Sequence, residues 1–160
     1  MTKKIITLAL TGAAILVMSG CSAKGPQFST FQKIAKQEES IVYFYRPDSV
    51  LNIIDTTGVF EIDSPDINYK KNMWDSKTIG KLRNNSFFKY KFKPGKHKFT
   101  DNMFKSPIEI NLKPNDYTCV KVKMGLFGFN SISEIDKYTC EKEIKTTLKM
   151  TKEDLANDFY

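Results

Sequence analysis

The stretch FFKYKFKPGKHKFTD, residues 87–101, alternates aromatic and lysine side chains ahead of a Pro-Gly turn. Phe88, Tyr90 and Phe92 fall on one face, and the lysines between them fall on the other. A period of two residues is that of a β-strand with one buried face. The stretch therefore predicts two consecutive strands around the turn PGK, with an aromatic inner face.

Two further strands are expected downstream of this stretch. Apolar and polar residues alternate in PIEINL (107–112) and again in YTCVKVKM (117–124). In the second of these, Cys119 shares a face with Lys121 and Lys123, opposite the face that carries the valines. We therefore expect Cys119 on the outer side of that strand.

The upstream part contains a strand of a different kind. IVYFYRP (41–47) carries apolar side chains on both alternating faces, which is typical of a central strand covered on both sides, and Pro47 ends it. VFEID (59–63) and KTIGKL (77–82) predict two more short strands. The residues between them, 64–76, have no sustained period and indicate a long excursion or an insertion.

The C-terminal part completes the expected fold. Apolar residues alternate over 144–150 and predict a last strand, and Thr151 with Asp154 approximates a capping box for a short helix over 152–159. Many short strands with only a terminal helix are typical of an antiparallel β-sandwich. We therefore expect a mainly β protein with one sandwich domain over 41–160.

The N-terminus has the layout of a secretory signal. Lys3 and Lys4 precede an apolar, uncharged run over residues 5–18, and MSGC (18–21) follows it. As a helix, this run of about 14 residues spans about 21 Å, which is short of the ~30 Å hydrocarbon core of a bilayer. MSGC resembles the bacterial lipobox, so we expect a lipoprotein signal peptide over 1–20, rather than an ordinary cleaved signal peptide or an uncleaved anchor.

In this interpretation Cys21 becomes the first residue and is lipidated. Fatty-acyl chains such as palmitate, carried as a diacylglycerol and an amide-linked chain, anchor a protein stably where a single chain does not. Residues 21–40 then form the lipidated cysteine and a tether that leads into a loosely attached segment. Because Ser22 stands where Asp is associated with inner-membrane retention, we expect attachment to the outer membrane, facing the periplasm.

The two remaining cysteines are Cys119 and Cys140. In a chain that is exported to an oxidising compartment, an even number of thiols is most simply explained by a structural disulfide. Such a bridge closes a loop of about 22 residues and stabilises the fold by about 3 kcal/mol on the loop-entropy estimate. Two free thiols, or a redox or metal role, are the alternatives, although one histidine cannot complete a usual zinc site.

Four motifs of the chain, YFYRP, IGKL, FKPGKH and NDYTCVKV, resemble those of a bacterial lipoprotein family known as domain of unknown function 2846. The resemblance runs from about Ile41 to Met124 and continues more loosely to Met150. It implies a prealbumin-like β-sandwich, similar to modules that cap or link larger exported proteins, and no established activity. The positions that carry it are Tyr45, Arg46, Pro47, Gly80, Pro94, Gly95, His97 and Tyr117.

Two residues of these motifs are candidates for ligand binding. Arg46 ends the central strand, where its planar guanidinium could bind a carboxylate or phosphate or pair with an acid or carbonyl of the fold. His97 is the only histidine and shares a face with Phe99, which favours packing over catalysis. Motifs of hydrolases, metalloproteases and phosphate-binding loops do not occur, so we expect no enzymatic activity, cofactor or metal.

Two surfaces are candidates for contact with a partner. Outward lysines on the strands either form a basic patch toward anionic lipid or polysaccharide, or are simply solvated; they are Lys89, Lys91, Lys93, Lys121 and Lys123. In GLFGF (125–129), Leu126, Phe127 and Phe129 lie between glycines and either fold back on the core or meet a partner. The formal net charge of +7 falls to +5 without Lys3 and Lys4.

The sequence thus favours a lipid-anchored, non-enzymatic module of the cell envelope that contacts an envelope protein or polymer. Nucleic acid is not an expected partner, because export separates the chain from it. The alternative is a periplasmic small-molecule-binding protein or enzyme with a pocket near Arg46 and His97.

Overall fold

The computed structural model describes residues 23–34, 38–49, 56–62, 76–102, 106–125 and 130–150. These residues form nine strands and one helix. In chain order they are β1 (Ser40–Arg46), β2 (Thr57–Ile62), β3 (Ser76–Leu82), β4 (Ser86–Phe92), β5 (Gly95–Asp101), β6 (Ile108–Leu112), β7 (Tyr117–Met124), β8 (Asn130–Ile135), α3 (Lys137–Ile144) and β9 (Leu148–Lys149).

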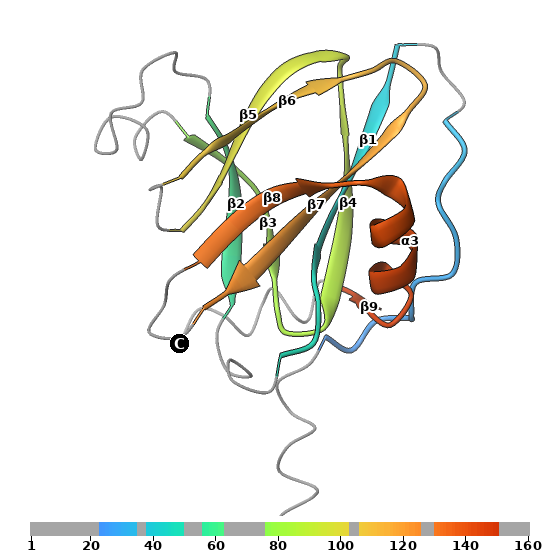
Figure 1. Ribbon diagram of the computed structural model, residues 1–160, viewed down its shortest axis with the longest axis vertical. Coiled ribbons are helices and arrows are strands. Elements are labelled where there is room, and N and C mark those ends of the chain that lie inside the picture. Colours follow the sequence, from blue (N-terminus) through green and yellow to red (C-terminus); the bar gives the residue numbers. More distant parts are fainter. Residues whose placement is uncertain are drawn as a thin grey trace, which may run out of the picture.

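The strands form two sheets that pack face to face, which confirms the expected β-sandwich (Figure 1). The five-stranded sheet has the order β8-β7-β1-β4-β9, and the four-stranded sheet has the order β3-β2-β5-β6. Most neighbouring strands are antiparallel. Two pairs within the five-stranded sheet, β1 with β7 and β4 with β9, are parallel.

Strand β1 is central and buried along its whole length, as its sequence predicts. Val42 and Phe44 belong to the core between the sheets, where the Phe44 ring stacks on Phe88 at 5.1 Å between centroids. The alternate residues of β1 face the other side of the five-stranded sheet. The core between the sheets contains Val42, Phe44, Val59, Leu82, Phe92, Phe99, Ile110, Leu112, Val120, Val122 and Ile132.

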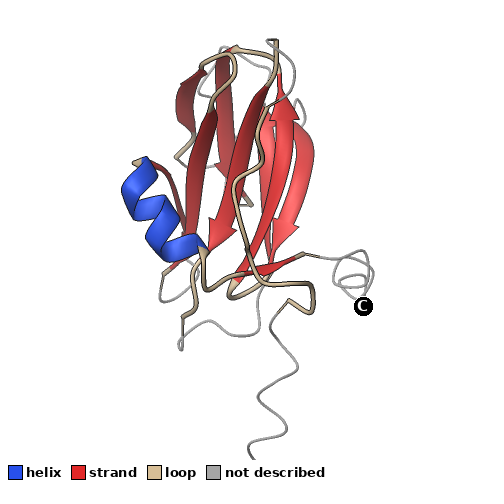
Figure 2. Cartoon of the chain, turned by 90° about the vertical axis from the view of Figure 1, so that its right-hand side faces the viewer, coloured by secondary structure: helices blue, strands red, loops and turns tan. Residues whose placement is uncertain are grey.

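A second apolar layer covers the outer face of the five-stranded sheet. Helix α3, which Figure 2 shows on the outside of the sandwich, and the N-terminal segment over residues 23–34 lie against this face. This explains why β1 is apolar on both alternating sides. The expectation of a loosely attached segment here is wrong, because Phe28 is buried and Phe31 and Ile34 pack against the same layer. Its buried members are Phe28, Ile41, Tyr43, Tyr45, Phe87, Cys119, Cys140 and Ile144.

The strand expected over 144–150 is wrong except at β9, because α3 ends at Ile144 and residues 145–147 form the turn between α3 and β9. The side chain of Asp136 caps the helix by accepting the backbone N–H of Thr139 at 2.9 Å. Cys140 and Ile144, four residues apart, form its buried stripe. The helix expected over 152–159 lies outside the described residues.

The turn after β4 carries the chain from one sheet to the other. β4 pairs with β1, and β5 pairs with β2 and β6, so the two strands around PGK are present but do not pair with each other. Gly95 has a φ of 135°, a conformation that residues with a Cβ rarely adopt. The aromatic inner face of β4 packs against the four-stranded sheet, and the ring of Phe88 lies against Gly80 of β3.

Candidate functional site

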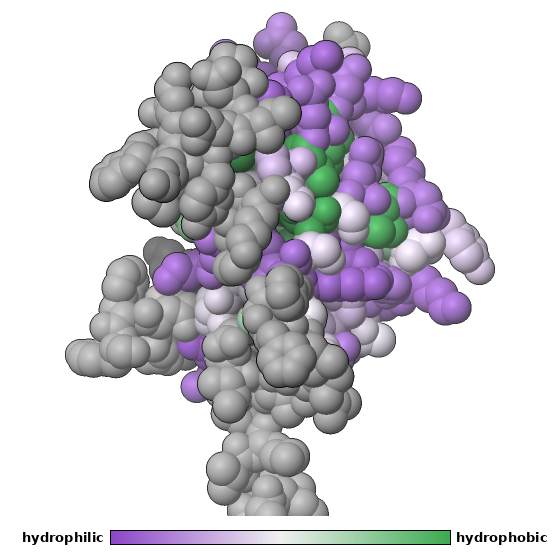
Figure 3. Space-filling model, turned by 60° about the vertical axis from the view of Figure 1, so that its left-hand side comes forward, coloured by the Kyte–Doolittle hydropathy of each residue, from purple (hydrophilic) through white to green (hydrophobic). Residues whose placement is uncertain are grey.

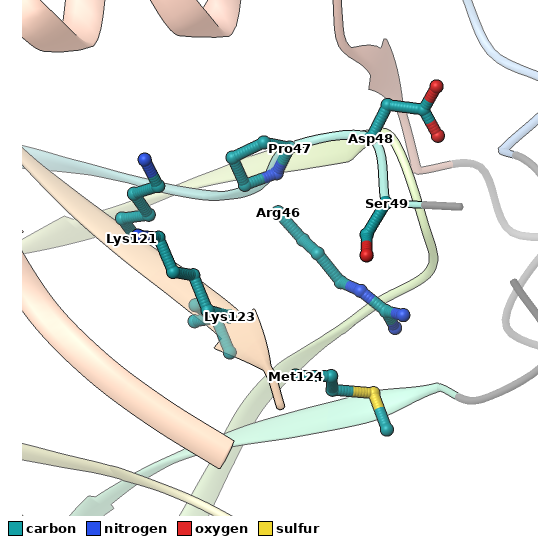
Figure 4. Close-up of a pocket in the computed structure, with 8 residues that line it drawn as sticks. Arg46, Pro47, Asp48, Ser49, Lys121, Lys123 and Met124 are labelled. Atoms are coloured by element: carbon teal, nitrogen blue, oxygen red, sulfur yellow. The ribbon is translucent and has the colours of Figure 1, made fainter. Parts of the chain in front are cut away.

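A pocket with a volume of about 310 Å³ lies where β1 ends. Residues 46–49, which continue β1, form one part of its wall, and residues 121–124 of β7 form the other. The two segments meet because β1 and β7 are adjacent and parallel, so both run toward the same end of the sheet (Figure 4). This pocket holds Arg46, one of the predicted site residues.

The charges around this pocket are largely engaged within the fold. Arg46 is only 1% exposed, so its guanidinium is part of the interior. The Nζ of Lys121 lies 2.6 Å from the carboxylate of Glu143, and its side chain points away from the guanidinium in Figure 4. Lys123 is exposed at the pocket, and Asp48 accepts a hydrogen bond from the amide of Asn84 at 2.6 Å.

His97 is held by two acceptors within the sandwich. Its Nδ1 lies 2.6 Å from Oε1 of Glu61, and its Nε2 lies 2.8 Å from the backbone oxygen of Lys93. Its ring packs against Phe92 at 5.1 Å between centroids and lies parallel to Phe99. Both ring nitrogens are therefore occupied by the fold, which supports the packing role over a catalytic one.

The structure does not bring Arg46 and His97 together. In the β1–β4 pair, Arg46 is opposite Ser86 and Ser40 is opposite Phe92, so the ring of Phe92 marks the end remote from Arg46. His97 contacts that ring. Six residues of extended chain separate the two ends, about 20 Å at 3.4 Å per residue. A single pocket near both residues, as in the alternative interpretation, is not formed.

Cys119 and Cys140 form a disulfide, which confirms the predicted pairing. Their Cα atoms are 6.1 Å apart, and both residues are buried. Cys119 lies on the outer side of β7, as expected, but helix α3 covers that side. The bridge therefore joins α3 to the central part of the five-stranded sheet.

A polar network that the sequence did not reveal lies beside the disulfide. The hydroxyl of Tyr45 donates to Glu143 at 2.7 Å, and Lys121 contacts the same carboxylate. Burial and the hydrogen bond to this carboxylate both raise the pKa of Tyr45. Burial alone would raise the pKa of Glu143, but the hydrogen bonds from Lys121 and Tyr45 outweigh it, so that pKa is lowered.

The N-terminal segment is fixed to the body by backbone hydrogen bonds. The N–H of Phe28 donates to the oxygen of Thr147 at 3.0 Å, and the N–H of Lys149 donates to the oxygen of Pro26 at 2.8 Å. The side-chain amide of Gln27 reaches the oxygen of Lys145 at 2.6 Å. These contacts place residues 26–28 beside β9.

Aromatic packing strengthens this attachment. The ring of Phe28 lies edge-on to Tyr43 and Phe87, at 5.9 and 5.3 Å between centroids. The ring of Phe31 stacks on Tyr117 at 4.3 Å. Such pairs add to the stabilisation that burial of the rings provides. The segment is thus an integral part of the fold. In the sequence, its scattered aromatic residues were the feature that indicated this packing.

Of the five lysines of the predicted basic patch, four are exposed and one is buried. Lys121 is buried, so it does not belong to an exposed patch. On β4, Lys91 pairs with Glu39 at 2.6 Å, and Lys89 donates to Gln32 at 2.6 Å. Hydrophilic residues also cover much of the described surface in Figure 3, with some hydrophobic residues visible between them. Solvation and local pairing account for the lysines on β4.

Several predicted site residues lie outside the described part of the chain: Cys21, Leu126, Phe127 and Phe129. Among the residues that the structure describes, no three His, Cys, Asp or Glu side chains are grouped so that they could hold a metal ion. No helix in these described ranges has the length and apolar character needed to cross a membrane.

Comparison with known proteins gives no relative for this chain. No protein-family model, curated protein or solved structure matches it. The resemblance to the family of domain of unknown function 2846 therefore stays a prediction from the quoted motifs. The function must be argued from the chain's own residues.

Proposed function

We propose that this chain is a lipoprotein of the bacterial cell envelope, anchored through acyl chains on Cys21. Its β-sandwich acts by contact with an envelope protein or polymer and not by catalysis. The observation that carries the proposal is the position of Cys21, between an apolar leader and the start of the packed body at Ala23. Cleavage before Cys21 leaves every described residue in place.

The buried disulfide supports a location outside the cytosol. Disulfides persist in oxidising compartments and are rare where thiols are kept reduced. Cys119 and Cys140 are paired, and Cys21 is left as the single cysteine in the leader region. This division of the three cysteines fits one lipidated residue and one structural bridge.

The surroundings of the two ligand-binding candidates support a non-enzymatic role. Both nitrogens of His97 face acceptors of the fold, and the guanidinium of Arg46 lies in the interior. A general acid or base must reach the proton that it transfers, and an anion-binding arginine must reach its ligand. Both side chains instead fit structural positions.

Metabolic labelling with a fatty-acid analogue tests the anchor. We expect label and the mass of two lipid groups on mature protein that begins at Cys21, and loss of both in Cys21→Ala. The matched control is the double variant Cys119→Ala, Cys140→Ala, which should keep the label. A mature protein that retains Met1, or that carries an unmodified Cys21, would refute the proposal.

Two further measurements test location and role in the native cell. Density-gradient separation of the membranes should place the protein with the outer membrane. Unbiased crosslinking should then recover an envelope protein or polymer joined to the sandwich. Recovery only as a monomer, under conditions that crosslink other envelope proteins, would contradict a contact role.

A second candidate function is binding of a small molecule in the pocket formed by residues 46–49 and 121–124. Its volume of about 310 Å³ favours this function, because ligand sites commonly occupy about 300 to 1,000 Å³. A screen for compounds that raise the melting temperature, repeated with Asp48→Ala and Lys123→Ala, tests it. A hit whose effect both folded variants retain would not bind in this pocket.

A further inference from the structure

Very little chain separates the proposed anchor from the packed body. Ala23 is 3% exposed, and only Ser22 stands between it and Cys21. Two Cα–Cα steps of about 3.8 Å limit the distance between these residues to about 8 Å. A flexible tether of some twenty residues, as first expected, would allow several times this distance.

The structure also identifies the end of the sandwich that lies next to the anchor. Leu148 of β9 pairs with Ser86, and Ser86 pairs with Arg46, so β1 ends at the level where β4 and β9 begin. Gln27 forms a bridge with Leu148, which brings the N-terminal segment to this level. In Figures 1 and 2 the described chain begins at this same end, which we call the anchor end.

Among the described residues, exposed lysines lie around residues 24–27, the first part of the N-terminal segment. Lys24 belongs to the segment itself. The backbone oxygen of Lys145 accepts a hydrogen bond from the side-chain amide of Gln27, and the backbone N–H of Lys149 donates to the oxygen of Pro26. All three lysines are exposed. At the pocket nearby, Lys123 is exposed as well, and Asp48 is the exposed carboxylate of the described residues that line it.

We propose that the anchor end of the sandwich rests directly on the headgroup layer of an anionic lipid surface, with Lys24, Lys145 and Lys149 at the contact. This inference rests on the acylation of Cys21 proposed above. The short link brings the body to the membrane, and the lysines favour anionic headgroups within a Debye length of them. The far end, where β4 runs into β5, then points away from the bilayer.

Lysine footprinting of the lipidated protein tests this orientation. The mature protein is purified from membranes and reconstituted in vesicles of equal parts phosphatidylcholine and phosphatidylglycerol, and then treated with an acetylating reagent. We expect Lys24, Lys145 and Lys149 to react about five-fold more slowly than in a variant with a Gly/Ser stalk inserted after Ser22. A stalk of about 12 residues gives a reach of about 20 Å.

Lysines at the far end provide the internal control. Lys91, Lys93 and Lys96 lie near the passage from β4 to β5 and should react equally in both proteins. In vesicles of phosphatidylcholine alone, we expect the protection at the anchor end to fall toward that of the stalk variant. Protection that is equal in both vesicles would overturn the anionic preference.

The outcomes separate this inference from the proposed function. Protein that sediments with the vesicles but shows equal reactivity with and without the stalk would overturn the direct contact and leave the anchor intact. Protein that carries no acyl chain and does not sediment with the vesicles would overturn both.

Discussion

Breaking the bridge between Cys119 and Cys140 is expected to lower the free energy of unfolding by about 3 kcal/mol. The two residues are 21 positions apart, so the closed loop holds about 22 residues. In the loop-entropy relation this length corresponds to the stated value at 25 °C. Helix α3 depends on the same bridge, because its buried stripe consists of Cys140 and Ile144.

Urea unfolding of the oxidised and the reduced protein measures this effect. Reduction keeps both sulfur atoms in place, so it removes the link without opening a cavity. The double variant Cys119→Ala, Cys140→Ala also deletes two buried sulfur atoms, and we expect it to lose about 1 kcal/mol more for each. The order of stability should therefore be oxidised, reduced, double variant.

Two controls make the experiment decisive. Cys21→Ala should unfold at the same urea concentration as the oxidised protein, since that residue precedes the packed body. Thiol titration of the natively purified protein must detect no free thiol at Cys119 or Cys140. A loss below about 1 kcal/mol on reduction, with the slope of the transition unchanged, would refute the view that the bridge stabilises the sandwich.

Three further predictions follow from the packing and the charges. A Cβ on Gly80 would lie 2.8 to 3.0 Å from atoms of the Phe88 ring, so Gly80→Ala should cost about 1 to 3 kcal/mol in urea unfolding; a cost that persists in a Phe88→Leu background would contradict this cause. The pKa of Glu143 is lowered from 4.5 in the folded protein. The ionised carboxylate therefore stabilises the fold above pH 4.5, and this stabilisation is lost as the pH falls through the lower pKa of the folded state. Stability measured against pH should therefore fall less steeply in Glu143→Gln below about pH 4.5, and parallel curves would exclude this carboxylate as the source. Phe28→Ala should lower stability by about 3 kcal/mol and expose residues 23–34 to limited proteolysis; an unchanged cleavage pattern would mean that other contacts hold the segment.

The strands could be predicted from the sequence because their pattern is local. The alternation in residues 87–101 places Phe88, Tyr90 and Phe92 on the inner face, and the structure agrees. Which sheet a strand joins is decided by contacts far away in the chain. For this reason, the continuity of β4 and β5 in sequence did not reveal that they belong to different sheets.

Two elements on the outer face of the five-stranded sheet were missed for physical reasons. Helix α3 is eight residues long, and its buried stripe is only Cys140 and Ile144, so its periodicity is too short to distinguish from that of a strand. The N-terminal segment pairs only through an isolated bridge between Gln27 and Leu148. It is fixed by Phe28 and Phe31, whose spacing of three residues is that of one helix face although the segment is not helical.

The candidate site was predicted less well than the fold. Arg46 and His97 were expected to lie near one pocket. The register of β1 and β4 instead puts them at opposite ends of the sandwich. Lys121 pairs with Glu143 of α3, and His97 contacts Glu61 of β2. Partnerships of this kind depend on the topology, which no single segment specifies.

The parallel pairing of β1 with β7 has a consequence for how the chain acquires its fold. Ile41 is opposite Tyr117, so the strand that pairs with this edge of β1 follows 76 residues later in the chain. Contacts between such distant residues slow folding and leave apolar surface open meanwhile. As the chain emerges N-terminus first, β1 can pair with β4 early, but its other edge stays uncovered until residue 124 has followed. A holding chaperone that shields this edge over this interval would therefore raise the yield of the native protein.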